Sequence, residues 1–133
     1  MILVDSSAWI EYLRATASPV HRYLRGILEK KQPVATTGVV MLEVLAGASD
    51  EARARKLSRL LGRCELLAAE EPSDHEAAAA LYRACRREGI TIRRPPDLLI
   101  ATIAIRTDTP LLHLDADFDA IARHSLLRVV DPA

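Results

Sequence analysis

The sequence contains little cysteine, and its cysteines are spaced badly for metal binding or redox chemistry. Cys64 and Cys85 lie 21 positions apart, and neither belongs to a CxxC pair. Zinc knuckles and dithiol redox sites both need closer spacing, so the sequence argues against either. We therefore expect both residues to be buried thiols.

Long hydrophobic runs are also missing. The longest uncharged runs, such as PVATTGVVML, are too short and too polar to span a bilayer, and the start lacks the basic region and apolar stretch of a signal peptide. The 133 residues are 50% hydrophobic and 27% charged, which is typical of a globular protein able to bury a core. We expect a single domain, residues 1–133, located in the cytoplasm.

The formal net charge is zero, so charge alone gives no reason to expect nucleic acid as a partner. Of the 18 basic residues, however, only three are lysine and the others are arginine. Arginine binds phosphate better than lysine does, because its planar guanidinium can donate two hydrogen bonds to one phosphate group. The basic residues gather at 52–59, 85–89 and 93–94. If acidic residues form a pocket, we expect these three groups to lie outside it on a more basic surface.

Strand-like and helix-like segments alternate along the chain. Short apolar stretches predict strands, and longer stretches with helical spacing predict helices. The expected strands are residues 1–4, 33–37, 64–68, 110–114 and 127–130. The expected helices are residues 6–15, 19–31, 39–48, 50–63, 73–89, 95–108 and 115–125.

Several helix ends carry recognisable signals. Ser18 followed by Pro19 predicts the start of the second helix, because proline is favoured at the first helical position. Ser49 is expected to cap the fourth helix, and Ser73 with Glu76 forms a capping-box pattern at the start of the fifth. Gly89 is expected to end that fifth helix.

This alternation predicts an α/β fold with a parallel sheet covered on both faces, because right-handed crossovers return each strand in the same direction. The carboxyl ends of such strands share one edge, where ligand crevices open. Asp5 follows the first strand and Asp115 follows the strand PLLHL. Two carboxylates far apart in the sequence are therefore expected at the same edge.

Two more acids are candidates for the same place. Asp97 opens an almost entirely apolar helix after two prolines. Glu43 stands in VVMLEVLAGA, a segment so apolar that we expect its helix to be largely buried. An unpaired buried carboxylate costs several kcal/mol, so something must compensate the charge of Glu43.

Each acid also has a simpler explanation. Asp5, Asp97 and Asp115 suit helix caps or first turns, a role worth roughly 0.5 to 2 kcal/mol each. Glu43 suits an ion pair with an arginine from another helix. Four independent roles of this kind need not fall around one crevice, whereas one bound divalent cation would compensate all four charges.

Four segments resemble PIN-domain ribonucleases, specifically the VapC toxins of bacterial toxin-antitoxin pairs: ILVDSSAWIEYL, VVMLEVLAG, RRPPDLLIATIAI and LLHLDADFDAIA. The resemblance covers essentially the whole chain. It implies a three-layer PIN-like fold, with a central, mostly parallel sheet of about four to five strands flanked by helices. Asp5 matches the first family aspartate, Glu43 the glutamate of the apolar helix, and Asp97 the aspartate before LLIA.

The last acidic position of the family corresponds to Asp115 or Asp117, and the resemblance does not choose between them. Ser7 matches a small hydroxyl residue beside the first aspartate, which makes it a candidate hydrogen-bond donor to Asp5. His113 departs from the pattern, because many relatives carry threonine there. Any contribution of that hydroxyl is absent from this chain.

The implied activity is a metal-dependent endoribonuclease, and an all-carboxylate site suits Mg²⁺ or Mn²⁺ better than zinc. Asp5 and Asp97 are the expected direct ligands, and Glu43 is expected to orient or deprotonate the attacking water. Asp115, with Asp117 behind it, is expected to ligate a second metal or hold water. Five aromatic residues give few stacking platforms, so backbone and shape contacts should dominate RNA binding.

The resemblance further implies partners. Apolar helices such as VVMLEVLAGA favour a twofold homodimer, and a VapB-type antitoxin would place an arginine or lysine against Asp5 and Asp97. Three rival functions have less support. A haloacid-type phosphatase should carry a second aspartate two residues after the first, where this chain has Ser7. A phospho-receiver domain should carry a mid-chain phosphoacceptor aspartate and a late lysine, which CELLA and the segment after Lys56 lack. A catalytically inactive PIN-like binding module is disfavoured because all four acids are present.

Overall fold

Four short parallel strands form the centre of the computed structural model, which describes residues 1–133. They are β1 (Ile2–Val4), β2 (Val34–Thr36), β3 (Glu65–Leu66) and β4 (Leu111–Leu112), in the sheet order β3-β2-β1-β4. Leu3 of β1 lies opposite Ala35 of β2 on one side and Leu111 of β4 on the other. The predicted α/β fold with a central parallel sheet is confirmed, and Asp5 follows one of its two inner strands.

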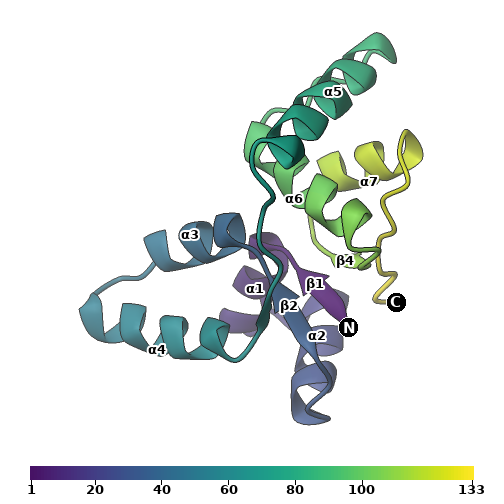
Figure 1. The fold of residues 1–133 in the computed structure, drawn as a ribbon. Coiled ribbons are helices and arrows are strands. Elements are labelled where there is room, and N and C mark those ends of the chain that lie inside the picture. The colour runs from purple at the N-terminus through teal and green to yellow at the C-terminus, as the bar shows by residue number, and fades with distance from the viewer.

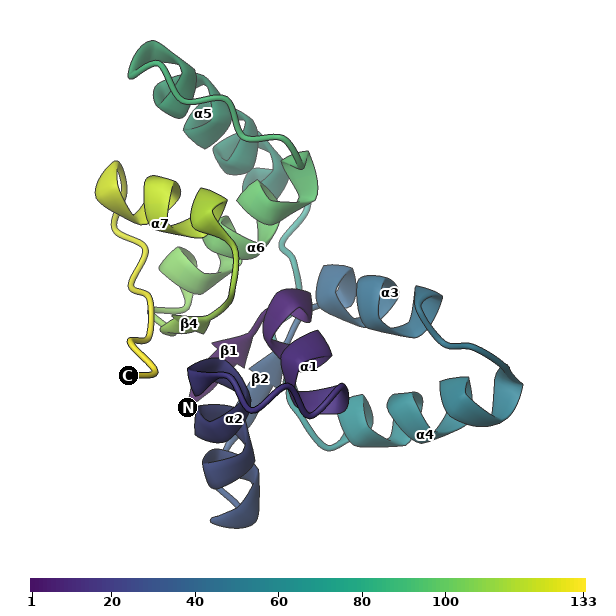
Figure 2. The ribbon, with the colours of Figure 1, turned by 180° about the vertical axis from the view of Figure 1, so that it is seen from behind.

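Seven helices connect and cover these strands. They are α1 (Ser6–Leu13), α2 (Pro19–Glu29), α3 (Gly38–Ala46), α4 (Glu51–Gly62), α5 (Ser73–Arg87), α6 (Pro95–Arg106) and α7 (Ala116–Arg123). Figures 1 and 2 show α1 and α2 together on one side of β1 and β2, while α3 and α4 form an arm that extends sideways. Helices α5, α6 and α7 gather on the side of β4. No helix has both the length and the apolarity needed to cross a bilayer.

The hydrophobic core is one cluster of 28 buried residues drawn from the sheet and the surrounding helices. Its largest fully buried side chains are Trp9 of α1 and Phe118 of α7. Strand β1 is buried throughout, as a strand covered on both faces should be. Cys85 is buried as predicted, whereas Cys64 is only half-buried, and neither forms a disulfide.

Two of the predicted helix ends are confirmed. Ser18 caps α2 by accepting a hydrogen bond of 3.1 Å from the backbone N–H of His21, with Pro19 at the first helical position. Helix α5 ends at Arg87, and Gly89 just beyond it has a φ of +79°. Glycine adopts this left-handed conformation without the steric cost that a Cβ would add.

The two other predicted caps are wrong. Asp50, not Ser49, caps α4, because its carboxylate accepts a hydrogen bond of 2.7 Å from the backbone N–H of Arg53. Helix α5 already includes Ser73, and the hydroxyl of Ser73 donates to the carbonyl of Glu70 instead of accepting from the helix. The capping box is therefore not formed, since its serine lies one position too far into the helix.

The predicted strand 127–130 is reduced to a single bridge between Leu111 and Val129. Two hydrogen bonds of 2.9 Å make it, from Leu111 N–H to Arg128 and from Val130 N–H to Leu111. Strand β4 is only two residues long, so few backbone groups remain on it for pairing with a fifth strand. The sheet therefore has four strands.

Helix α3 is less buried than its composition predicts. Only Val40 and Val44 are buried, and the side chain of Leu42 is 69% exposed. The helix lies in the projecting arm and contacts α1, α4 and α6, and its Leu42 side remains open. The expectation of a largely buried helix is wrong, and an apolar surface remains uncovered.

Candidate metal centre

Three carboxylates from distant parts of the chain converge beyond the carboxyl end of β1. Asp5, Glu43 and Asp97 each offer one oxygen, and these three oxygens lie within 4.8 Å of one another. Asp5 links β1 to α1, Glu43 lies in the middle of α3, and Asp97 lies in the first turn of α6. Asp5 and Asp97 are each only 3% exposed. The parallel topology thus brings together residues separated by 38 and 54 positions.

Asp5 caps a helix with one carboxylate oxygen and keeps the other without a partner. Its Oδ2 accepts hydrogen bonds from the backbone N–H of Ser7 at 3.0 Å and from the Ser7 hydroxyl at 2.6 Å, which caps α1. Its Oδ1 is buried and has no hydrogen-bond partner. The Ser7 hydroxyl also accepts from the backbone N–H of Leu114, at 2.9 Å. The cap therefore occupies one oxygen, and the other remains available to a cation.

Asp97 has no capping bond to explain its burial. Its Oδ2 is buried without a hydrogen-bond partner, and α6 begins with Pro95 and Pro96 and lacks a side-chain cap. Burial, the largest cause, and the negative charges of Asp5, Asp115 and Asp117 together raise the pKa of Asp97 to about 7, while Arg94 opposes them. An uncompensated acid in this position favours its neutral form.

Glu43 is held by two neighbours. The hydroxyl of Ser6 donates to its Oε1 at 3.2 Å, and the guanidinium of Arg94 bonds its Oε2. The ion pair considered from the sequence is therefore present, although its arginine precedes α6 and the glutamate also belongs to the carboxylate trio. The guanidinium and any cation on the trio would therefore draw on the same carboxylate.

Asp115 and Asp117 lie outside the trio but close enough for their charges to raise the pKa of Asp97. Asp115 caps α7 by accepting from the backbone N–H of Asp117 at 2.9 Å. The ring of His113 accepts from the backbone N–H of Asp115 at 3.0 Å, which fixes the loop after β4. Both aspartates are half-buried at the border of the trio, and the choice of a fourth acid stays a prediction.

The donor set fits a hard divalent cation. Every candidate ligand is a carboxylate oxygen, and two of these oxygens are buried without any hydrogen bond. Leaving like charges together in a buried site is unfavourable, and a bound cation removes both the repulsion and the unsatisfied oxygens. Mg²⁺ and Mn²⁺ prefer such oxygen ligands.

Sequence reasoning missed two residues that contact the trio. Ser6 bonds Glu43, and the only signal for it was the second hydroxyl beside Asp5. Arg94 belongs to a basic group that was expected outside any acidic pocket, yet its side chain reaches Glu43. Neither contact follows from spacing, because 37 and 51 residues separate the partners.

The raised pKa of Asp97 predicts how stability depends on pH. Between the ordinary value of 3.8 and about 7, the folded state binds more protons than the unfolded chain, so raising the pH through this range favours unfolding. We expect the melting temperature of the metal-free protein to fall from pH 5 to pH 8. Circular dichroism melts measure this, and Asp97→Asn should flatten the slope; an equal slope in the variant would contradict the assignment.

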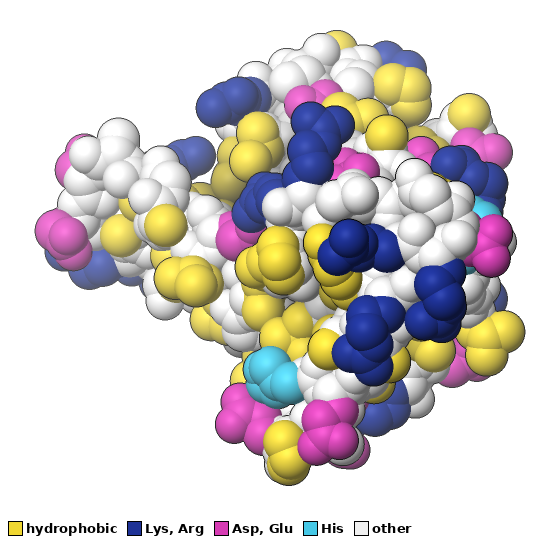
Figure 3. Space-filling view, turned by 90° about the horizontal axis from the view of Figure 1, so that it is seen from above, with side chains coloured by type: hydrophobic (Ala, Val, Ile, Leu, Met, Phe, Trp, Pro, Cys, Tyr) yellow, Lys and Arg dark blue, Asp and Glu magenta, His cyan; other side chains and the backbone are white.

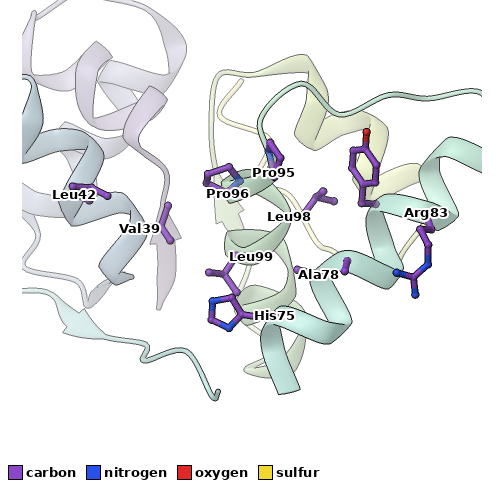
Figure 4. Close-up of a pocket in the computed structure, with 11 residues that line it drawn as sticks. Val39, Leu42, His75, Ala78, Arg83, Pro95, Pro96, Leu98 and Leu99 are labelled. Carbon is purple, nitrogen blue, oxygen red and sulfur yellow. The ribbon is translucent and has the colours of Figure 1, made fainter. Parts of the chain in front are cut away.

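A groove borders the site. Figure 4 shows Val39 and Leu42 of α3 facing Pro95, Pro96 and Leu99 of α6 across it. Helix α5 completes the lining with residues that include His75 and Arg83. From above, Lys and Arg side chains spread over the face that carries α5, and hydrophobic side chains lie exposed beside them (Figure 3). An acidic centre is thus flanked by an apolar groove and a basic surface.

Comparisons with known proteins agree on one family. The PIN domain model matches residues 2–124. A VapC ribonuclease of Mycobacterium bovis and ribonuclease VapC11 of Mycobacterium tuberculosis are each 44% identical over 124 residues, which is 92% of this chain and 92% of theirs.

Solved structures show the same fold. The crystal structure of VapBC2 from Rickettsia felis, bound to a promoter DNA fragment, aligns with a TM-score of 0.76 and 21% identity over 98% of both chains. That of M. tuberculosis VapC20, described as a Sarcin-Ricin loop cleaving toxin, aligns with a TM-score of 0.69 and 20% identity, covering 96% of this chain and 99% of that one. The chain belongs to the PIN-domain family and, within it, to the VapC ribonucleases of toxin-antitoxin systems.

Proposed function

We propose that this protein is a Mg²⁺- or Mn²⁺-dependent endoribonuclease, the toxin of a type II toxin-antitoxin pair. One observation carries the proposal: three carboxylates meet within 4.8 Å beyond the central strands, and two of their oxygens are buried without partners. The helix cap of Asp5 and the ion pair of Glu43 leave these two oxygens unused, and an all-carboxylate set is the kind that Mg²⁺ prefers. The 44% identity to proteins named ribonuclease supports RNA as the substrate.

The roles of the side chains follow from their contacts. Asp5 and Asp97 would hold the ion, because their free oxygens are buried and lack partners. The chemistry that a bound ion would supply there is activation of a water molecule and compensation of negative charge on the phosphate being attacked. Glu43, which is less buried, accepts the proton of the attacking water through a carboxylate oxygen that Ser6 orients. Ser7 keeps Asp5 in its rotamer from the opposite side.

Asp115 and Asp117 complete the proposed site from its border. Their carboxylates lie at the start of α7, where they add negative charge beside Asp97. We assign Asp115 the fourth position, as ligand of a second ion or of water, with Asp117 behind it. Because Asp115 Oδ1 caps α7, only its other oxygen is free for that role.

The substrate class is RNA with accessible, unpaired segments. The chain has five aromatic residues, and Trp9 and Phe118 are fully buried, so base stacking contributes little. The exposed arginines on the face of α5 suit backbone phosphates instead. Recognition through backbone and shape is therefore expected to dominate.

The proposed protein partner is a VapB-type antitoxin. Several solved structures of similar fold are titled VapBC complexes, which motivates the search for a second chain. An arginine or lysine of that chain would neutralise Asp5 and Asp97 where the metal would otherwise sit. Co-expression with the adjacent small reading frame tests this. If the product of that frame neither copurified nor relieved growth arrest, the toxin assignment would lose its support, although the nuclease assignment could still hold.

The decisive experiment for the nuclease is cleavage of a labelled single-stranded or hairpin RNA by the purified protein. We expect cleavage with Mg²⁺ or Mn²⁺ and none after the ions are chelated with excess EDTA, because the carboxylates alone cannot activate water. Restoring Mn²⁺ should restore cleavage, which separates metal loss from denaturation. Full activity in excess chelator would overturn the metal assignment, and no cleavage with any divalent ion would favour an inactive binding module.

A twofold homodimer is the proposed assembly. The side chain of Leu42 on α3 is 69% exposed and lies beside the apolar groove. In a twofold dimer, the same surface of a second copy of the chain would cover it. We expect a dimer in size-exclusion chromatography with light scattering at tens of micromolar. Leu42→Glu should give a monomer, whereas Leu126→Glu, at an 84% exposed position near the C-terminus, should not. A monomeric wild-type protein would contradict the proposal.

A further inference from the structure

Arg94 is the only basic side chain that forms an ion pair with the carboxylate trio. Its guanidinium bonds Oε2 of Glu43 and forms no other ion pair or hydrogen bond. The side chain of Arg94 is 56% exposed, whereas that of Glu43 is 15% exposed. The pair therefore lies at the mouth of the site, with the arginine on the solvent side.

The side chain of Arg94 is held weakly, whereas its backbone is held firmly. An ion pair this exposed stabilises a protein by about 0 to 1 kcal/mol, so the side chain can leave at little cost. The backbone, in contrast, is held, because Arg94 precedes α6 and the next two residues are the helix-starting prolines Pro95 and Pro96. Arg94 is thus a movable cation with an anchored Cα, three residues before Asp97.

A metal ion on the trio would compete with this arginine. An ion held by Asp5 and Asp97 would bring a second positive charge next to the Glu43 carboxylate that already bonds the guanidinium, and two positive charges so close together repel each other. Metal binding would therefore release Arg94. Once released, the guanidinium would be free to bind an anion such as an RNA phosphate. Its planar set of N–H donors can form two parallel hydrogen bonds to a phosphate.

We propose that Arg94 is the counter-ion of Glu43 in the metal-free protein and a ligand of the scissile phosphate once metal and RNA are bound. This inference rests on the proposed nuclease function and adds a residue to it. The guanidinium would donate to a non-bridging phosphate oxygen and stabilise the charge that develops there during cleavage.

Two measurements on Arg94→Ala should move in opposite directions. The dissociation constant for Mn²⁺ without RNA, measured by calorimetry, should fall about threefold or more, because the competitor of the metal is gone. Cleavage at saturating Mn²⁺ should fall about 10²-fold in kcat, because the phosphate loses a charged donor in the transition state. Arg94→Lys should recover only part of kcat, since an ammonium lacks the fork.

Arg93→Ala is the matched control. It removes the same charge one residue earlier, and only the backbone N–H of Arg93 contacts the site, at Asp117. It should change Mn²⁺ affinity and kcat less than about twofold if the effects of Arg94 are local and not a general loss of positive charge. Equal effects in both variants would overturn the proposal.

The remaining outcomes are equally clear. Weaker Mn²⁺ binding together with a lower melting temperature in Arg94→Ala would make the residue a structural support and overturn the proposal. Unchanged kcat would overturn the phosphate role. If the wild-type protein bound no Mn²⁺ and cleaved no RNA, the proposed nuclease function itself would fail. If the wild type bound Mn²⁺ and cleaved RNA but Arg94→Ala behaved like it, only the proposal for Arg94 would fail.

Discussion

Asp97→Asn is expected to abolish RNA cleavage and at the same time to raise the melting temperature of the metal-free protein at pH 8. Asparagine has the same shape but no charge, so it removes the repulsion from Asp5, Asp115 and Asp117 and the cost of burying an anion. It would also remove one of the two proposed ligands of the metal. Cleavage of labelled RNA and thermal melts with and without Mg²⁺ measure the two effects.

Asp5→Asn should also abolish cleavage without unfolding the chain, because asparagine caps helices as well as aspartate does and can still accept from Ser7. In both variants the stabilisation that Mg²⁺ gives the wild type should disappear. A variant that keeps full cleavage, or that keeps the Mg²⁺-dependent rise in melting temperature, would show that its aspartate is not a ligand.

Asp74→Asn is the control for burial, since Asp74 is also only 3% exposed. Its carboxylate is paired, with Oδ1 at 3.0 Å from Nε of Arg106 and Oδ2 at 2.9 Å from Nη2, and this hydrogen bonding lowers its pKa. Removing the charge there should lower the melting temperature and leave Mg²⁺ binding intact. Two equally buried aspartates should thus respond with opposite signs, because only one has its charge compensated within the chain.

Glu43→Gln is expected to lower the cleavage rate by about 10²-fold or more, the range for general acid-base groups, with a smaller effect on metal affinity. Glutamine keeps a carbonyl oxygen for the hydroxyl of Ser6 and for Arg94 but cannot take a proton from water. Single-turnover cleavage at saturating Mn²⁺, together with calorimetric Mn²⁺ binding, separates the two roles.

A purely structural Glu43 predicts the reverse pattern. In that case Glu43→Gln would lower the melting temperature by weakening the ion pair with Arg94 and would spare the cleavage rate. Glu70→Gln serves as a comparison, because Glu70 also pairs with an arginine, Arg106, but on an exposed surface away from the trio. It should leave both cleavage and metal affinity unchanged.

Local patterns predicted the order of the elements because they depend on neighbours in the sequence. Apolar runs identified β1, β2 and β4, and the signals at Ser18 and Gly89 correctly marked helix ends. Local patterns predicted the wrong helix cap where two adjacent residues were both suitable. Ser49 and Asp50 are both good caps, and only the backbone path, which places the Asp50 carboxylate at the N–H of Arg53, decides between them.

The sequence by itself determined that Asp5 would lie at the carboxyl end of a strand in a parallel sheet, because alternating strands and helices give such a sheet and its strands end at one edge. That this strand is an inner one came from the structure. Tertiary structure alone decided which acids come within 4.8 Å, that both Asp5 and Asp97 keep an unpartnered oxygen, and that Arg94 reaches Glu43. It also left Leu42 exposed on an apolar helix. The physical reason is that periodicity specifies which face of an element is apolar, whereas contacts between residues 37 to 92 positions apart depend on how the helices pack, which no local pattern encodes.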